Sequence, residues 1–183
     1  MATRKSIAAA AATLRQIARP WSGVACRATA PNWANRRDIA SGLGAAHRGG
    51  RWNVVGRRAV YLAEDRATAA AETDARLRGL GLDDALKRFE LWDIRLGESV
   101  RAEVDAPAVL AALGMTIDEL MEVDHEAAFM ARKSTVCQDL GEAAAELGVQ
   151  VIGYPSRRLV GGRCVVLFPD VPPMVKLEYP GDE

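Results

Sequence analysis

Short apolar segments separated by turn residues crowd together at the end of this sequence. Three such segments occupy residues 149–153, 164–168 and 175–179, and each has the length of a β-strand. Strands that follow one another with only a turn between them pair as antiparallel neighbours, whereas a doubly wound sheet needs a helix after every strand. This clustering predicts an α+β fold rather than a doubly wound α/β fold.

The earlier part of the chain alternates between helical and strand-like segments. Capping residues, prolines and glycines mark several helix ends, as in the capping-box sequence Thr-Ile-Asp-Glu at 116–119, which opens a helix. Residues 29–50 are irregular and rich in glycine, which predicts a long loop of the kind that usually serves a function. The remaining predictions are helices over 6–19, 66–77, 107–113 and 134–147, and strands over 24–28, 59–63 and 89–96.

Composition predicts one globular domain and excludes several kinds of site. The chain has 183 residues, 49% hydrophobic and 26% charged, which is enough to bury a core without disulfides. No apolar run is long enough to span a membrane, and the first residues are too weakly hydrophobic for a secretory signal, so a cytoplasmic location is the default expectation. The three cysteines lie far apart, and there are two histidines, so neither a disulfide framework nor a metal site is predicted.

Charge and common motifs narrow the function classes further. Lys and Arg equal Asp and Glu at 24 each, so the formal net charge is zero, which argues against a dedicated nucleic-acid binder. Sequence motifs of phosphate loops, zinc proteases and serine hydrolases are absent. A serine nucleophile would require Ser156 to meet His47 or His125 in space, and nothing in their spacing indicates that they do.

Two segments combine residue types that chemistry can use. Residues 49–72 read GGRWNVVGRRAVYLAEDRATAAAE: a glycine loop, an Arg-Trp-Asn triplet, a tyrosine within a strand and a glutamate on the next helix. Residues 154–168 read YPSRRLVGGRCVVLF, which places a Pro-Ser-x-Arg turn before a glycine-containing hairpin. Together they resemble the RES domain, a family of bacterial toxins. In this resemblance the characteristic arginine, tyrosine, glutamate and serine are Arg51, Tyr61, Glu72 and Ser156.

The resemblance implies a NAD-consuming toxin. The expected fold is an ADP-ribosyltransferase-like split β-sheet core with flanking helices, in which residues 21–183 form one RES-like NAD-binding catalytic domain and residues 1–20 an N-terminal helical extension. The expected reaction cleaves the nicotinamide–ribose bond of NAD, its substrate, and transfers ADP-ribose to a host protein, water or phosphate without a metal. The expected partner is an antitoxin of the Xre helix-turn-helix type, with no direct contact to nucleic acid or membrane.

Elementary chemistry is compatible with a NAD site at these residues. Cleavage passes through an oxocarbenium-like state, which the Glu72 carboxylate would stabilise. Arg51, and Arg27 on the first strand, offer a pyrophosphate the paired donors that lysine lacks. The Tyr61 ring can stack on nicotinamide and exclude water. The expected catalytic residues are Glu72, Arg51 and Tyr61, and the expected NAD-binding residues are Arg27, Arg51, Asn53, Tyr61 and Ser156.

Each of these residues also has a structural explanation, which the sequence leaves open. Glu72 lies four residues before Arg76, the favoured order for an exposed ion pair on a helix. The tyrosine suits a buried strand, and the arginine a solvated loop. Asn53 and Ser156 can bond their own backbone in turns.

The function likewise has an alternative from another class, a non-catalytic nucleotide- or partner-binding module with the same fold. The presence of all four characteristic residues favours the enzyme. A DNA-binding regulator is disfavoured by the zero net charge and by the lack of a helix-turn-helix signature. Release of nicotinamide from NAD would distinguish the enzyme from the binding module.

Overall fold

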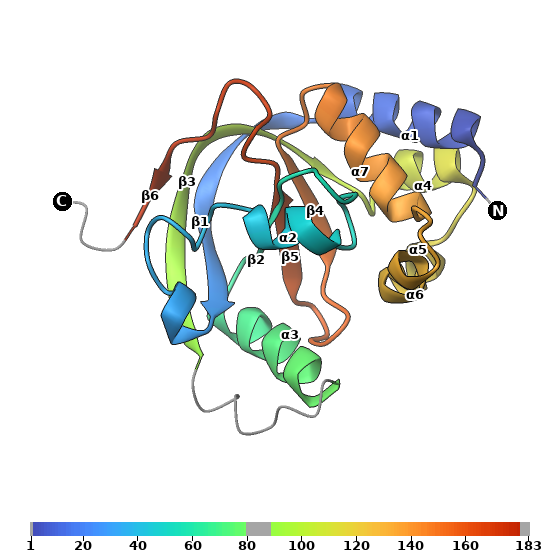
Figure 1. The fold of residues 1–183 in the computed structure, drawn as a ribbon. Coiled ribbons are helices and arrows are strands. Elements are labelled where there is room, and N and C mark those ends of the chain that lie inside the picture. Colours follow the sequence, from blue (N-terminus) through green and yellow to red (C-terminus); the bar gives the residue numbers. More distant parts are fainter. Residues whose placement is uncertain (1, 80–88, 180–183) are drawn as a thin grey trace.

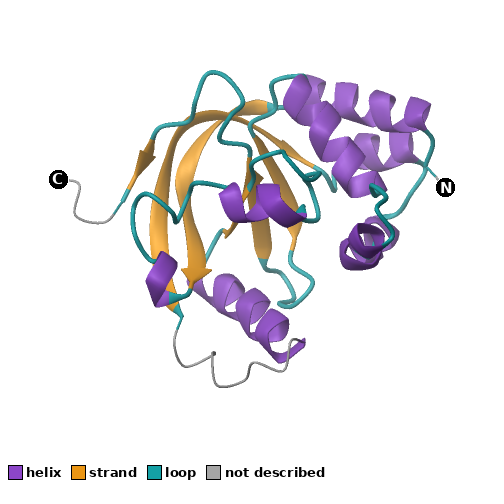
Figure 2. Ribbon diagram, in the orientation of Figure 1, coloured by secondary structure: helices purple, strands orange, loops and turns teal. Residues whose placement is uncertain are grey.

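The computed structural model describes residues 2–79 and 89–179, which form helices packed around a mixed sheet (Figures 1 and 2). The helices are α1 (Arg4–Ile17), α2 (Leu43–Arg48), α3 (Arg66–Gly79), α4 (Pro107–Leu113), α5 (Ile117–Glu122), α6 (His125–Met130) and α7 (Val136–Glu146), with the short 3₁₀ helix η1 (Pro31–Trp33). The strands are β1 (Arg19–Thr29), β2 (Val60–Ala63), β3 (Glu90–Glu103), β4 (Val151–Pro155), β5 (Arg163–Leu167) and β6 (Leu177–Glu178). The predicted α+β class is confirmed.

Within the described residues, the six strands form one sheet in the order β1-β2-β5-β4-β3-β6, and β1 also pairs with β3. The pairings therefore run from β1 through β2, β5, β4 and β3 back to β1. The β3–β4 pair is parallel, and the other pairs are antiparallel. The predicted hairpin near the end of the chain is β4–β5, in which Tyr154 pairs with Cys164.

Two strands are longer in the structure than the sequence predicts. The strand expected over 24–28 is β1, which starts at Arg19, and the strand expected over 89–96 is β3, which continues to Glu103. The two strands pair along most of their length, from Arg19 opposite Arg101 to Thr29 opposite Glu90. Polar residues that carry no strand signal are thus recruited by a partner strand distant in sequence. The start of β1 also ends helix α1 at Ile17, before the predicted residue 19.

The loop expected over 29–50 contains two short helices, which the sequence analysis missed. Helix α2 is bounded by two glycines with positive φ, Gly42 at 69° and Gly49 at 71°. The glycines that suggested an irregular loop therefore delimit a helix, because they adopt backbone conformations that other residues resist. At the other end of the chain, the strand expected over 175–179 is reduced to the two residues of β6.

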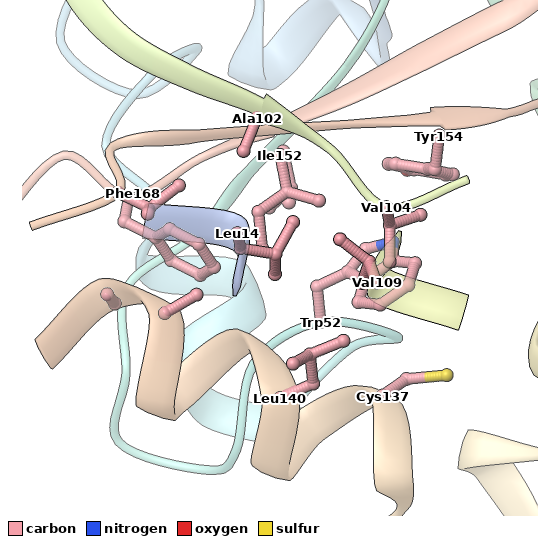
Figure 3. Packing of buried hydrophobic residues seen from close by; sticks show 14 of the residues in the cluster. Leu14, Trp52, Ala102, Val104, Val109, Cys137, Leu140, Ile152, Tyr154 and Phe168 are labelled. Carbon is pink, nitrogen blue, oxygen red and sulfur yellow. The ribbon is translucent and has the colours of Figure 1, made fainter. Parts of the chain in front are cut away.

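The larger hydrophobic core lies between the sheet and the helices α1, α4 and α7, which lie together to one side of the sheet (Figures 1 and 3). Leu14, Trp52, Leu140 and Phe168 are fully buried in it. Helix α1 contributes Leu14 to this core, so the helix packs against the rest of the described chain. A second buried cluster, which includes Ile94 and Leu167 among other aliphatic residues, packs on the other side of the sheet.

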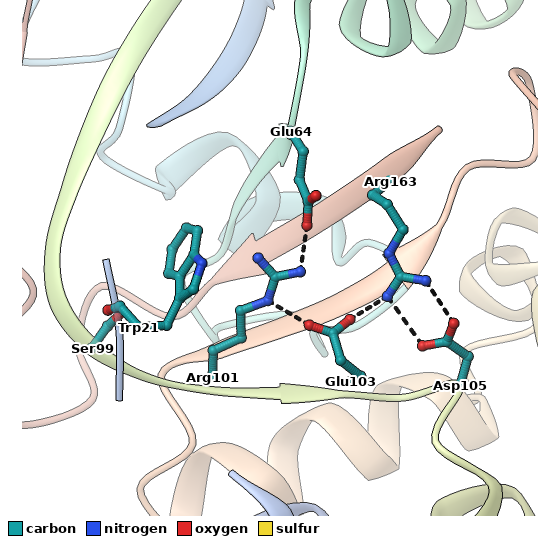
Figure 4. Close-up of polar contacts among 7 residues, drawn as sticks. All are labelled: Trp21, Glu64, Ser99, Arg101, Glu103, Asp105 and Arg163. Atoms are coloured by element: carbon teal, nitrogen blue, oxygen red, sulfur yellow. Dashed lines mark hydrogen bonds and ion pairs between the residues drawn. The ribbon is translucent and has the colours of Figure 1, made fainter. Parts of the chain in front are cut away.

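A network of ion pairs joins the ends of β2, β3 and β5 (Figure 4). Arg101 on β3 pairs with Glu64 after β2 and, at 2.6 Å, with Glu103. Arg163, the first residue of β5, pairs with Glu103 and, at 2.6 Å, with Asp105, and its guanidinium lowers the pKa of the Asp105 carboxyl. Glu64 lies two residues before the start of α3, and Arg163 immediately follows the β4–β5 turn. The network therefore fixes the positions from which both α3 and this turn depart.

Candidate functional site

The Arg-Trp-Asn loop is folded over the hydroxyl group of Tyr61, on β2. This hydroxyl donates a hydrogen bond to Asn53 Oδ1 at 2.7 Å and accepts one from the Trp52 backbone N–H at 2.9 Å. Burial is the main cause that raises the pKa of Tyr61, and the hydrogen bond from the Trp52 backbone and the Arg51 charge act in the opposite direction. A Cβ atom on Gly50 would lie 2.4 Å from the Tyr61 hydroxyl oxygen, so the close approach requires glycine.

Asn53 is fully buried and engaged with the protein through both ends of its amide. Its Nδ2 donates to the carbonyl oxygens of Ala45, Val54 and Arg57, and its Oδ1 accepts from Tyr61. The predicted interaction of Asn53 with NAD stays untested, and what the structure gives this residue is a role in holding the loop.

Helix α7 packs against the Arg-Trp-Asn loop and holds it in place. Gln138 Nε2 donates to the Gly50 carbonyl at 2.9 Å, and Gln138 Oε1 accepts from the Thr135 backbone at the helix start. A Cβ atom on Gly141 would lie 1.9 Å from the carbonyl oxygen of Trp52, so loop and helix are in direct backbone contact. Sequence reasoning missed both roles, although the Thr-x-x-Gln spacing at 135–138 signals the helix cap.

Arg51 reaches the carboxyl end of helix α5. Its Nη1 donates to the carbonyl oxygens of Met121 at 2.8 Å and Val123 at 3.2 Å. A cation at this end is favoured by the helix dipole. Burial is the main cause that lowers the pKa of His125, and the Arg51 charge acts in the same direction. Arg51 is half-buried, and its side chain anchors the loop and places a positive charge beside it.

Glu72, on α3, meets Ser156 in the β4–β5 turn. The Ser156 hydroxyl donates to Glu72 Oε1 at 2.6 Å, and the backbone N–H of Arg157 donates to the same oxygen at 3.1 Å. Ser156 Oγ in turn accepts from the N–H groups of Arg158 and Leu159, so the turn holds the serine and the serine orients the carboxylate. The side chain of Arg76 lies outside the described part of the structure, so the alternative pair with Glu72 is not tested.

Tyr154 links the two halves of the site. Its ring packs against Trp52 with centroids 5.4 Å apart, and it lies on β4 two residues before Ser156. Burial raises the pKa of Tyr154 well above its usual value, with smaller contributions from Cys164, Tyr61 and Glu72 that Arg51 opposes. Tyr154 is therefore close enough to each of these groups to feel its charge, although sequence reasoning did not single out Tyr154.

Arg27 Nη1 donates a hydrogen bond to the carbonyl oxygen of Ile39. This bond does not link Arg27 to Arg51, Tyr61, Glu72 or Ser156. The predicted contact of Arg27 with a pyrophosphate stays a prediction. Within residues 2–79 and 89–179, no three His, Cys, Asp or Glu side chains gather in a group that could hold a metal ion. None of the described helices has the length and apolar character required to cross a lipid bilayer.

Comparison with known proteins identifies a family and a similar fold. The family model of the RES domain matches residues 24–183. Among solved structures, the chain is similar to one described as the crystal structure of the M. tuberculosis MbcT–MbcA toxin–antitoxin complex. The TM-score is 0.73 at 22% sequence identity, over 95% of this chain and 90% of that chain, so the likeness concerns the fold. A search of curated proteins found no significant match.

Proposed function

The chain belongs to the RES domain family, and we propose that it is the toxin of a toxin–antitoxin system that cleaves the nicotinamide–ribose bond of NAD. The ADP-ribose is transferred to an acceptor, which is a host protein, water or phosphate. The observation that carries the proposal is the hydrogen bond between Ser156 and Glu72, which joins residues 84 positions apart and orients a carboxylate. An oriented carboxylate is what an oxocarbenium-like transition state requires.

The proposed reaction breaks the bond between ribose C1′ and the nicotinamide nitrogen. The nitrogen keeps the bonding electron pair, so nicotinamide leaves as a neutral molecule, and positive charge develops on the ribose. Glu72 stabilises this charge, and Ser156 acts as a positioning residue by holding the carboxylate in one orientation. The acceptor then forms a bond to C1′ and gives up its proton. No metal or strong general acid is needed for a neutral leaving group.

Arg51 and Tyr61 have different tasks in this proposal. Arg51 places a guanidinium beside the loop, where it can attract the anionic pyrophosphate of NAD. Tyr61 is bonded to Trp52 and Asn53, so it shapes the loop that carries Arg51. These hydrogen bonds hold the loop in one conformation before a ligand binds, so the loop is preorganised for binding.

We extend the proposal to the fold and the partner. An ADP-ribosyltransferase-like split core is supported by β3, which pairs with β1 up to Arg101 and with β4 from Arg101 to Glu103, so that the sheet divides along this strand. An antitoxin is the proposed partner, since the similar solved structure is described as a toxin–antitoxin complex. Its proposed type, Xre, is the one that resemblance to the RES family implies. The proposed location is the cytoplasm, where NAD and an antitoxin are both accessible.

The test is to mix the purified chain with NAD and measure released nicotinamide by chromatography, with mass spectrometry of the ADP-ribose products. Release is expected, and the products identify the acceptor. Expression of the chain alone should deplete NAD or modify a host protein and stop growth, and co-expression with the product of the adjacent gene, the proposed antitoxin, should restore growth. Intact NAD, unmodified proteins and normal growth would favour the non-catalytic binding module.

Replacing Arg51 by lysine is expected to weaken NAD binding about tenfold despite the retained charge, because the paired donors of the guanidinium are lost. Calorimetry on the Glu72→Gln background, where NAD should persist, measures the affinity. Arg37→Lys, at an exposed loop position, serves as the matched control. Equal affinity of Arg51→Lys and the control would assign Arg51 to loop anchoring alone.

A further inference from the structure

A pocket of about 320 Å³ lies beside Gln138, whose side chain also donates a hydrogen bond to the Gly50 carbonyl next to the Arg-Trp-Asn loop. It is formed by the end of α2, the segment after Asn53, the end of α6 and the start of α7. Its volume is at the lower end of the range for ligand pockets and suits one large side chain. Its walls include Arg48, Val54, Val55, Phe129, Arg132 and Lys133.

The walls of this pocket combine apolar surface with positive charge. Val55 is 59% exposed and Phe129 44%, so part of the apolar lining of the pocket is open to solvent. Contiguous exposed apolar surface of this kind is a sign of an interaction site. Three of the lining residues that the structure describes are cationic, and none is acidic.

The turn after α6 carries two of the three cations. Arg132 has a φ of 53°, in the left-handed region, and the chain reverses there through hydrogen bonds from the Arg132 N–H to Phe129 and from the Lys133 N–H to Ala128. Both residues are exposed. Their charges therefore stand at a defined turn next to an exposed aromatic ring, which favours an anionic, partly apolar occupant.

The polar groups inside the pocket favour a protein segment over a small molecule. The Gln138 amide is already used, with Nε2 bonded to Gly50 and Oε1 to Thr135. Small-molecule sites rely on a few buried polar groups to orient the ligand, and here the amide at the wall is occupied. An apolar side chain in the pocket would contact its apolar walls, and carboxylates at the rim would pair with its cations. This mode of binding requires no free polar group inside the pocket.

We propose that this pocket docks an acidic segment of a protein partner, which inserts one apolar side chain against Val54, Val55 and Phe129 and pairs its carboxylates with Arg48, Arg132 and Lys133. The docking site is separate from Glu72 and Ser156 and does not depend on NAD chemistry. Gln138 connects the pocket to the Arg-Trp-Asn loop through its hydrogen bond to the Gly50 carbonyl.

The test uses an acetylated and amidated peptide, Glu-Asp-Phe-Asp-Glu, titrated into the ¹⁵N-labelled full chain. Saturable changes in the amide signals of Val54, Val55 and Phe129 are expected. Two comparison peptides separate the contributions: one has alanine in place of phenylalanine, and one has lysine at all four acidic positions. Both should bind at least about tenfold more weakly, and binding of the first peptide should weaken as NaCl rises from about 0.05 to about 0.5 M.

Two variants test the site itself. Phe129→Ser and the double variant Arg132→Glu/Lys133→Glu should each weaken peptide binding at least about tenfold, and both alter exposed positions. The matched controls are Met174→Ser, 79% exposed, and Arg4→Glu/Lys5→Glu on α1, which should bind like the parent chain. Unchanged binding in the pocket variants would overturn the proposal. So would absence of signal changes at the pocket, or a stronger response of the same signals to AMP than to the peptide.

Discussion

Replacing Glu72 by glutamine is expected to reduce the rate of nicotinamide release at least about 100-fold, which corresponds to about 2.7 kcal/mol of lost transition-state stabilisation. The amide oxygen of glutamine can still accept the hydrogen bonds that Ser156 and the Arg157 N–H donate to Oε1. The fold should therefore be preserved, and NAD binding should change little, because the missing charge matters most when the ribose becomes positive. Steady-state kinetics together with a thermal melt separate these effects.

The control for this substitution is Glu146→Gln, which removes an equal charge from an exposed position on α7. It should leave turnover unchanged. Turnover of Glu72→Gln within about twofold of the parent, or less than about 0.5 kcal/mol, would remove Glu72 from the catalytic assignment. Glu72 would then be a structural acceptor for the β4–β5 turn.

Replacing Gly141 by alanine is expected to destabilise the fold by about 3 kcal/mol or more. Alanine is normally favoured over glycine within a helix by about 1 kcal/mol. At this position the new Cβ atom would lie 1.9 Å from the carbonyl oxygen of Trp52, so α7 and the Arg-Trp-Asn loop would have to separate. Urea unfolding should report the loss of stability, and any folded fraction should show weakened NAD cleavage because the loop is displaced.

Gly44→Ala provides the matched control for this prediction. Gly44 is also helical, in α2, and a Cβ atom there would meet no atom within 4 Å. This variant should be as stable as the parent chain or slightly more stable. If Gly141→Ala unfolds at the same urea concentration as Gly44→Ala, the contact between α7 and Trp52 is not a rigid one.

Local sequence signals located many elements of this fold. The helix predicted over 107–113 coincides with α4, since Pro107 suits the first helical turn and Gly114 takes a φ of 67° just after the last. The capping box at Thr116 begins α5, and the turn between residues 155 and 163 connects β4 to β5. These signals act between residues a few positions apart, so they can be read without knowledge of the fold.

For the candidate site, the sequence motifs predicted the main residues, and the tertiary structure showed the contacts that hold them. Resemblance to the RES domain singled out Arg51, Tyr61, Glu72 and Ser156 from short motifs, and family membership is confirmed. The contacts that support these residues could not be predicted, because Gln138 and Gly141 come from a helix distant in sequence from the loop, and Tyr154 packs on the equally distant Trp52.

The sequence by itself determined the α+β class, the main helices, the β4–β5 hairpin and the segments that carry the site. Only the tertiary structure decided how far β1 and β3 extend, which face of α7 meets the loop, and that the Ser156 hydroxyl lies 2.6 Å from Glu72. The physical reason is the distance along the chain over which each kind of interaction acts. Caps, turns and periodic apolar residues act over a few residues of chain, whereas strand pairing, burial and hydrogen bonds across the core depend on which distant segments the packed fold brings together.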